Sequence, residues 1–387
     1  MTNRIRHLVT KTSLATLVAL GTVGTVALAQ TQSNGQQASS QDSGTMQRAD
    51  KEDMRPVLMK LQELGAKPIG TQSVEETRKG PTPAEAVKAL LKDQGKDPDA
   101  LMAQMNVKKQ DMTYPTGGGE QPVRIYTPEG QAPQGGWPLI VYYHGGGWVI
   151  ADIDTYEASA MGLAKQANAI VASVEYRHGP ENKFPAAHED SFAAYKWALD
   201  NAQQFGANRA KVAVAGESAG GNLAINTAIA ARDQNVQKPV HMLLVYPVAG
   251  VDMNTPSYQK NANAIPLSKQ GMEWFVQNAT NGGSDLQDPR LDIVGKADVK
   301  NLPDATVITA EIDPLLSEGK QLADKLKAAG SQVTYQNHEG VTHEFFGMAA
   351  VLDDAKRAQA TAARELKQAF SGATTTGSTG SQQPPKQ

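Results

Sequence analysis

The chain has 387 residues with no cysteine, and its formal net charge is -3 at pH 7. This length is enough to bury one large hydrophobic core or two modest ones. The balance of charge indicates no nucleic-acid partner. The lack of cysteine excludes disulfides, thiolate metal sites and a cysteine nucleophile.

Residues 1–29 have the pattern of an export signal peptide: three cations, an uncharged and mostly apolar run over 13–29, and the small-x-small cleavage sequence Ala27-Leu28-Ala29. The cations are Arg4, Arg6 and Lys11. The alternative, a transmembrane anchor, is less favoured because the run is short and contains glycines. We expect cleavage before Gln30, after which the protein has no stable membrane anchor. We expect the mature protein to be exported, either periplasmic or secreted.

Two polar segments flank the rest of the chain. Residues 30–45 are rich in Gln, Ser and Gly, and residues 371–387 are rich in Gly, Thr, Ser, Gln and Pro. Such segments cannot bury enough apolar surface to offset the entropy of ordering them. We expect a disordered spacer and a disordered tail, neither of which takes part in the chemistry.

Apolar residues at helical spacing begin at Met46 and predict one helix that stops at Gly65 and another that follows Pro81-Thr82-Pro83. Their apolar positions are Met54, Val57, Leu58, Leu61 and Leu64 in the first, and Val87, Leu90 and Leu91 in the second. Two amphipathic helices before the first strand are an addition to the main fold. They are either a cap over a site or plain structural packing.

Short apolar runs then alternate with helical patterns. Residues 137–143 are almost continuously apolar, which is typical of a strand buried on both faces. Other strand-like runs are 102–112, 122–126, 169–174, 212–215, 242–246, 305–309 and 333–335, with helical patterns at 186–203 and 317–329. The alternation predicts an α/β fold with a mostly parallel sheet and helices on both faces, whose site lies beyond the carboxyl ends of the strands. The polar stretch 251–283 is either an excursion near that site or a surface insertion.

Gly216-Glu217-Ser218-Ala219-Gly220 follows one of these strand runs and precedes a helical pattern. The spacing Gly-x-Ser-x-Gly in this context is typical of a nucleophile elbow, a strained turn that exposes a serine hydroxyl at the top of a sheet. Only glycine fits such a turn cheaply, because a side chain would meet the neighbouring backbone. We expect Ser218 to be a nucleophile.

A serine nucleophile needs a histidine base, and the base needs an orienting carboxylate. After a nucleophile elbow the chain order is serine, acid, histidine. Since His241 opens an apolar strand run, this order leaves His338 and His343. We favour His343, because it lies in a loop after the last strand run, whereas His338 lies within or just past that run. Asp313 is the best candidate for the acid, since it sits in a turn at the end of a strand run; Glu311 is its main competitor.

His144-Gly145-Gly146-Gly147 follows the strand run 137–143. Acyl transfer needs preorganised donors for the negative charge on a carbonyl oxygen. We expect backbone N–H groups of Gly145, Gly146 and Gly147 to serve as donors together with that of Ala219, and His144 to support the loop by hydrogen bonding. A phosphate cradle is disfavoured because no Lys-Ser/Thr or Gly-x-Gly-x-x-Gly pattern follows. We find no histidines at metal-ligand spacing and expect no metal and no cofactor.

Together these motifs resemble the hormone-sensitive-lipase-like carboxylesterases of the α/β-hydrolase fold. The matching segments are His144–Gly147, Gly216–Gly221, Asp313–Leu315 and His343, supported by Glu175–Glu181, Phe184–Ala187 and Asn301–Pro303. The resemblance implies a cap over residues 46–98, a catalytic domain over 99–370 and the triad Ser218, Asp313 and His343. It also implies hydrolysis of short to medium acyl esters through an acyl-enzyme intermediate.

The chain departs from the family pattern at three places. Glu217 stands where many members have Asp, and Glu344 stands where glycine is common after the histidine; His178 lies in a stretch that is more apolar in the family. Glu344 either perturbs His343 or binds a cationic substrate group. Two other functions stay open: an amide or lactone hydrolase on the same triad, and a non-catalytic ligand-binding protein on this scaffold.

Overall fold

The structure is a computed structural model that describes residues 44–49 and 54–372. The expected signal peptide lies outside the described residues, as do nearly all of the expected spacer and tail. In the part of the chain that is described, no helix has the length and apolar character needed to cross a membrane.

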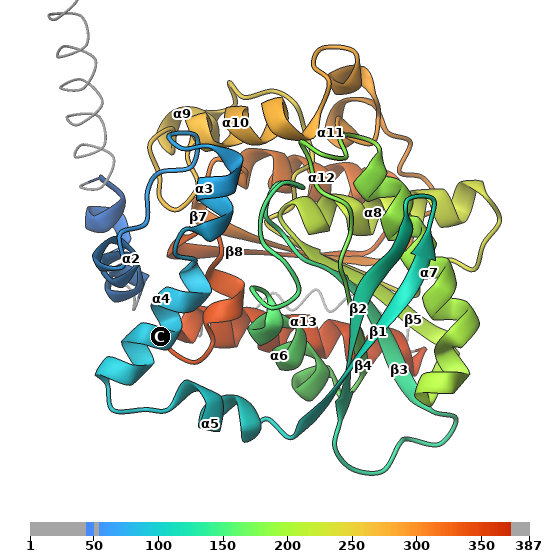
Figure 1. Ribbon diagram of the computed structural model, residues 1–387. Helices are drawn as coiled ribbons and strands as arrows, with labels where there is room; N and C mark the ends of the chain where they lie inside the picture. The colour runs from blue at the N-terminus through green and yellow to red at the C-terminus, as the bar shows by residue number, and fades with distance from the viewer. Residues whose placement is uncertain (1–43, 50–53, 373–387) are drawn as a thin grey trace, which may run out of the picture. The chain divides into compact units, whose positions relative to one another are not determined.

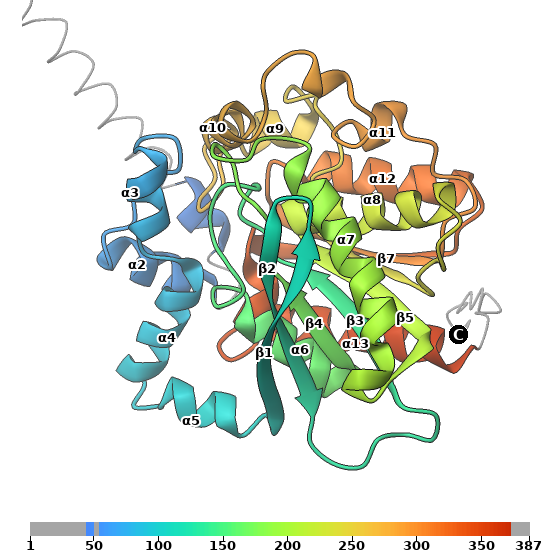
Figure 2. The ribbon, with the colours of Figure 1, turned by 45° about the vertical axis from the view of Figure 1, so that its right-hand side comes forward.

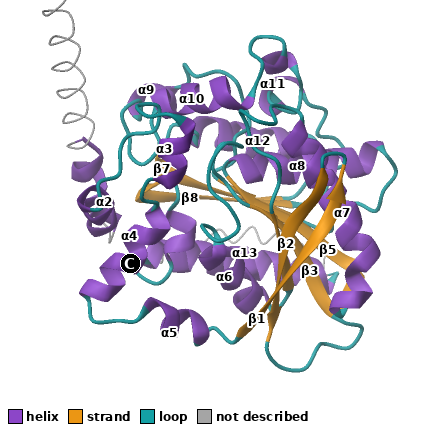
Figure 3. Ribbon diagram, in the orientation of Figure 1, coloured by secondary structure: helices purple, strands orange, loops and turns teal. Residues whose placement is uncertain are grey.

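Eight strands form one sheet in the order β1-β2-β4-β3-β5-β6-β7-β8. The strands are β1 (Val107–Thr116), β2 (Gly119–Pro128), β3 (Trp137–Tyr143), β4 (Ile170–Val174), β5 (Ala207–Glu217), β6 (Met242–Val245), β7 (Ala305–Ile312) and β8 (Val333–Thr342). β2 pairs antiparallel with β1 and β4, and every other pairing is parallel. Figure 3 shows this sheet between helices, which confirms the predicted mostly parallel α/β fold.

Strand β3 explains why the central runs are apolar throughout. Leu139 and Val141 belong to one buried cluster and Ile140 and Tyr142 to another, because successive side chains point to opposite faces. The first face is covered by α7 (Ala186–Asn201), α8 (Ala219–Asp233) and α12 (Leu316–Ala328); the second is covered by α6 (Glu157–Ala167) and α13 (Asp353–Ser371). Figures 1 and 2 show the two helical layers from different sides.

Residues 44–48 are helical. Between residue 54 and the first strand lie the helices α2 (Met54–Glu63), α3 (Val74–Lys79), α4 (Pro83–Asp93) and α5 (Pro98–Ala103). Helix α2 buries four of the five expected apolar positions, while Leu64, just beyond its end, is exposed. Helix α4 starts at a capping box of Thr82 and Glu85 and packs against α2. The two predicted helices are therefore present, and α3 and α5 are additional short ones.

The polar stretch after β6 contains α9 (Pro256–Lys260) and α10 (Lys269–Ala279). Leu267 and Phe275 of this stretch line the pocket that also contains Ser218. The stretch is therefore an excursion that contributes to the site. The remaining short helices are η2 (Ala202–Phe205), η3 (Asp285–Gln287), α11 (Ile293–Lys296) and η4 (Phe345–Met348).

Candidate active site

Ser218 lies between β5 and α8, in a backbone conformation that is strained for a residue with a side chain: φ is 56° and ψ is -118°. A Cβ atom on Gly216 would overlap the carbonyl oxygen of Gly220, and one on Gly220 would overlap that of Tyr143. The two glycines let the turn pass this close to its neighbours. The strain and the position are those of a nucleophile elbow at a helix N-terminus.

His343 and Asp313 follow the ends of the neighbouring parallel strands β8 and β7. Nδ1 of His343 lies 2.6 Å from Oδ2 of Asp313, and both side chains are buried. Burial lowers the pKa of His343 and the Asp313 carboxylate raises it, with an upward net direction. The structure thus joins the expected acid to the expected base.

The two competitors have other partners. Glu311 forms an ion pair with Lys260. His338 lies on β8, buried, with Nδ1 2.6 Å from Oδ1 of Asp354 at the start of α13. Neither residue lines the pocket that contains Ser218 and His343.

The loop after β3 can accept only glycine. Gly146 and Gly147 have φ of 95° and 60°, and a Cβ atom on Gly147 would overlap the ring of Phe275. A Cβ atom on Gly145 would overlap the hydroxyl of Tyr156. Gly146 and Gly147 line the pocket with Ser218, and Ala219 is the first residue of α8, where free N–H groups favour negative charge.

The pocket has a volume of about 250 Å³. It is lined by Ser218 and His343 and also by Ile69, Arg78 and Pro83 of the N-terminal helical region. The helices before the sheet therefore form part of the pocket wall.

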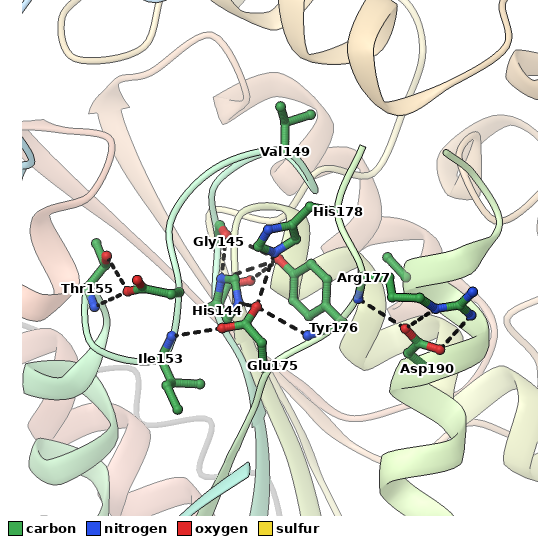
Figure 4. Close-up of polar contacts among 12 residues, drawn as sticks. His144, Gly145, Val149, Ile153, Thr155, Glu175, Tyr176, Arg177, His178 and Asp190 are labelled. Atoms are coloured by element: carbon green, nitrogen blue, oxygen red, sulfur yellow. Dashed lines mark hydrogen bonds and ion pairs between the residues drawn. The ribbon is translucent and has the colours of Figure 1, made fainter. Parts of the chain in front are cut away.

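His144 supports the glycine loop through several contacts (Figure 4). Its Nδ1 lies 2.8 Å from the carbonyl oxygen of Gly145, and its Nε2 lies 3.0 Å from Oε1 of Glu175. The Tyr176 hydroxyl donates to the carbonyl oxygen of His144 at 2.9 Å, and the two rings stack. Burial alone would raise the pKa of Glu175, but the nearby His144 and His178 lower it overall.

Sequence reasoning missed Glu175 and His178 as members of this site. The sequence analysis found no metal-ligand spacing, whereas the structure brings one ligand atom each of His144, Glu175 and His178 within 4.8 Å of the others. The signal lay in the strands: Tyr143 and Val174, the last residues of β3 and β4, are register partners. His144 and Glu175, the residues that follow these two strand ends, therefore lie side by side.

Two further carboxylates lie near the base. Glu344 has φ of 73°, accepts a hydrogen bond of 2.7 Å from the Tyr156 hydroxyl, and places Oε1 3.7 Å from Nε2 of His343. Burial raises the pKa of Glu344. Glu217 is buried behind the elbow, accepts hydrogen bonds from the Tyr142 and Tyr246 hydroxyls, and has its pKa raised by burial to about 7.

Known proteins are similar to this chain in fold and in sequence. A family model described as alpha/beta hydrolase fold matches residues 140–347, and the chain belongs to this family, in its hormone-sensitive-lipase-like branch. The chain is 36% identical to "Carboxylesterase NlhH" of Mycobacterium tuberculosis, over 74% of this chain and 89% of that one. It is 31% identical to "Ethyl acetate hydrolase" of Pseudomonas putida, over 70% of this chain and 83% of that one.

A solved structure agrees with these relatives. The Pyrobaculum calidifontis esterase superposes with a TM-score of 0.69 at 33% identity, covering 81% of this chain and 98% of that one. The resemblance predicted from the motifs is thus confirmed, and the protein is a carboxylesterase of this family.

Proposed function

We propose that this carboxylesterase hydrolyses esters of short to medium acyl chains, with Ser218 as nucleophile, His343 as base and Asp313 as the orienting acid. The observation that carries the proposal is the 2.6 Å contact between His343 and Asp313 at the wall of the pocket that also contains Ser218. A serine, an aspartate and a histidine in this chain order are the residue types of an α/β-hydrolase triad, which supports the proposal.

The reaction proceeds in two halves. His343 takes the proton of the Ser218 hydroxyl as its oxygen attacks the ester carbonyl, and it returns the proton to the departing alcohol. Water then attacks the acyl-enzyme by the same route and releases the acid. The N–H groups of Gly145, Gly146, Gly147 and Ala219 are the proposed donors to the oxyanion, and Asp313 stabilises the imidazolium form of His343.

The acyl-chain range is supported by the pocket. Its volume of about 250 Å³ is below the roughly 300–1,000 Å³ usual for sites of drug-sized ligands. The ring of Phe275 and the residues of the N-terminal helical region close its walls. A pocket of this size supports a preference for acetyl or butyryl groups over long acyl chains.

Purified protein should be assayed on p-nitrophenyl esters from acetate to palmitate. We expect turnover to peak at short chains, and Ser218→Ala to lower kcat by about 10⁴-fold or more. The exposed Ser284 provides a matched control, since Ser284→Ala should keep wild-type turnover. A Ser218→Ala protein that folds and retains more than a few per cent of the activity would reject the assignment.

We also propose that the protein is exported. The support is the charged start, the apolar run 13–29 and the cleavage sequence before Gln30. Expression of the full chain with mass spectrometry of its N-terminus tests this: we expect Gln30 at the N-terminus of an extracytoplasmic form. An intact N-terminus in the cytoplasmic fraction would contradict it.

A further inference from the structure

The side chains of His144, Glu175 and His178 form a cluster, called here the His-Glu-His cluster, behind the glycine loop. Figure 4 shows Glu175 joined to both imidazoles by dashed lines. Nε2 of His144 lies 3.0 Å and Nε2 of His178 lies 3.2 Å from the same atom, Oε1 of Glu175. Two nitrogens therefore converge on one carboxylate oxygen.

The hydrogen bonds of His144 direct its Nε2 at the carboxylate of Glu175. A neutral imidazole has one N–H and one lone pair. The Nδ1 of His144 faces the carbonyl oxygen of Gly145 at 2.8 Å, so Nδ1 holds the hydrogen and donates it. In the neutral ring the lone pair of Nε2 then points at the carboxylate oxygen of Glu175, and either a second proton on the ring or a bound metal ion makes this contact favourable.

The Nε2 atom of His178 is a second nitrogen that faces the carboxylate of Glu175. Its Nε2 is buried and makes no hydrogen bond, although it lies beside Glu175. The other carboxylate oxygen, Oε2, accepts a hydrogen bond of 3.3 Å from the N–H of Ile153, which fixes the orientation of the carboxylate. Burying an unpaired polar atom is costly, so the structure maintains a site that a cation would complete.

We propose that the His-Glu-His cluster binds one divalent transition-metal ion of the zinc type. Two imidazoles and one carboxylate with an open position are a known ligand set for such ions. The donation from His144 to the Gly145 carbonyl is the outer hydrogen bond that metal-bound histidines usually make. His178 lines the pocket, which gives the ion a route of entry and water a place in the open position.

The cluster is close to the size that the ion requires. Bonds of about 2.0–2.2 Å put neighbouring ligands of a tetrahedral ion roughly 3.3 Å apart. The three ligand atoms lie within 4.8 Å of one another, so the widest pair has to close by at most about 1.5 Å. His178 lies in the loop after β4 with 17% of its side chain exposed, whereas His144 is fully buried, so His178 is the ligand that moves.

Binding is tested by titrating the purified full chain, freed of metal with a chelator, with Zn²⁺ in a calorimeter and with Co²⁺ by visible absorption. We expect one ion per chain. His178→Leu and His178→Gln, checked for folding by thermal unfolding, should bind at least about 100-fold more weakly. His338→Gln removes a buried histidine that also pairs with a carboxylate, and should bind like the wild type.

The variant His343→Gln distinguishes Zn²⁺ bound at the His-Glu-His cluster from Zn²⁺ bound at the proposed triad. It should keep full binding. Absence of one-to-one binding of either ion, equal binding by the His178 variants, or loss of binding in His343→Gln would each overturn the proposal. The titration uses no substrate, so its failure is distinct from a failure of the proposed esterase chemistry. In the wild type we also expect bound Zn²⁺ to lower esterase turnover reversibly, because the ion draws in His178, which lines the pocket that contains Ser218.

Discussion

At the scale of single residues, Glu344 is the group that most directly acts on the proposed base. Its Oε1 lies 3.7 Å from Nε2 of His343, the nitrogen that would accept the serine proton. A carboxylate at that distance stabilises the imidazolium form. It is one of the groups that raise the pKa of His343, after Asp313, against the lowering effect of burial.

Replacement Glu344→Gln should therefore shift the pH profile of the enzyme. The base must be neutral to accept a proton, so activity rises with pH through the pKa of His343. Removing the carboxylate lowers this pKa, and the acid limb of kcat/KM moves to lower pH. The measurement is kcat/KM against pH on p-nitrophenyl acetate. The exposed Glu339 supplies the control, because Glu339→Gln should leave the profile in place, and an unmoved or upward-moved limb in Glu344→Gln would refute the effect.

Motif and chain order made the pairing of Asp313 with His343 predictable, because both follow strand ends, and the structure has them 2.6 Å apart. Their catalytic roles stay predictions until the variants are assayed. The contacts of Glu175 could not be assigned from the sequence. For Glu344 the sequence left two alternatives open, and the structure has the contact with His343. The first depends on the register of β3 against β4, and the second on a backbone turn with positive φ.

At the scale of elements, helix α3 is held over the pocket largely by one side chain. None of its residues is buried. Arg78 donates to the carbonyl oxygens of Val149 and Gly179 at 2.9 and 2.8 Å and to both carboxylate oxygens of Glu181 at 2.7 and 2.8 Å. A helix with so little buried surface depends on such contacts for its position.

Arg78→Met should loosen this wall of the pocket and weaken substrate binding. We expect KM to rise by about tenfold, which corresponds to about 1.4 kcal/mol, with a much smaller change in kcat. Lys79, on the same helix, pairs with Glu75 at the surface, so Lys79→Met is the matched control and should leave KM unchanged. Steady-state kinetics on the ester series decide the matter, and equal KM values for the two variants would show that Arg78 does not position the helix.

The order and type of most elements were predictable, but two arrangements were not. The expected start of the run 102–112 was wrong, since Met102 and Ala103 belong to α5 and the strand begins at Val107. From there this run and the run 122–126 form an antiparallel hairpin, β1 with β2, because the short turn at Gly117 and Gly118 cannot hold a crossover helix. Strand β8 continues to Thr342, well beyond the apolar run that ends at Tyr335. Its polar residues pair with β7 and contact α13. These are tertiary contacts, so they cannot be predicted from the local pattern of hydrophobic residues.

At the scale of the whole molecule, the core encloses carboxyl groups whose pKa values burial raises. Glu318 on α12 accepts hydrogen bonds from the N–H groups of Ala249 and Gly250, while its Oε2 has no partner. Burial raises the pKa of Glu318 to about 8 from its usual 4.5. In the unfolded chain this group is ionised above pH 4.5, so between pH 4.5 and 8 the folded protein binds the additional proton.

The free energy of unfolding should for this reason fall as pH rises through that window, since stability decreases wherever the native state binds more protons. Glu318→Gln removes the titration while keeping the shape. The stability of the variant relative to wild type should grow between pH 5 and 8 by roughly 2–5 kcal/mol. Buried His188 and His241, whose pKa values burial lowers to about 4, have the opposite effect up to about pH 6.5. Their contribution is common to both proteins and cancels in the difference.

Denaturant unfolding at pH 5, 6.5 and 8 measures this difference, with the exposed Glu129→Gln as a control that should stay parallel to wild type at every pH. A constant offset between Glu318→Gln and wild type would mean that Glu318 is ionised in the folded protein. Growth of the difference with pH would instead show that the fold keeps a neutral acid beside the strand that presents Asp313. That neutrality matters for the site, because an ionised Glu318 would add a second negative charge near the carboxylate that orients His343.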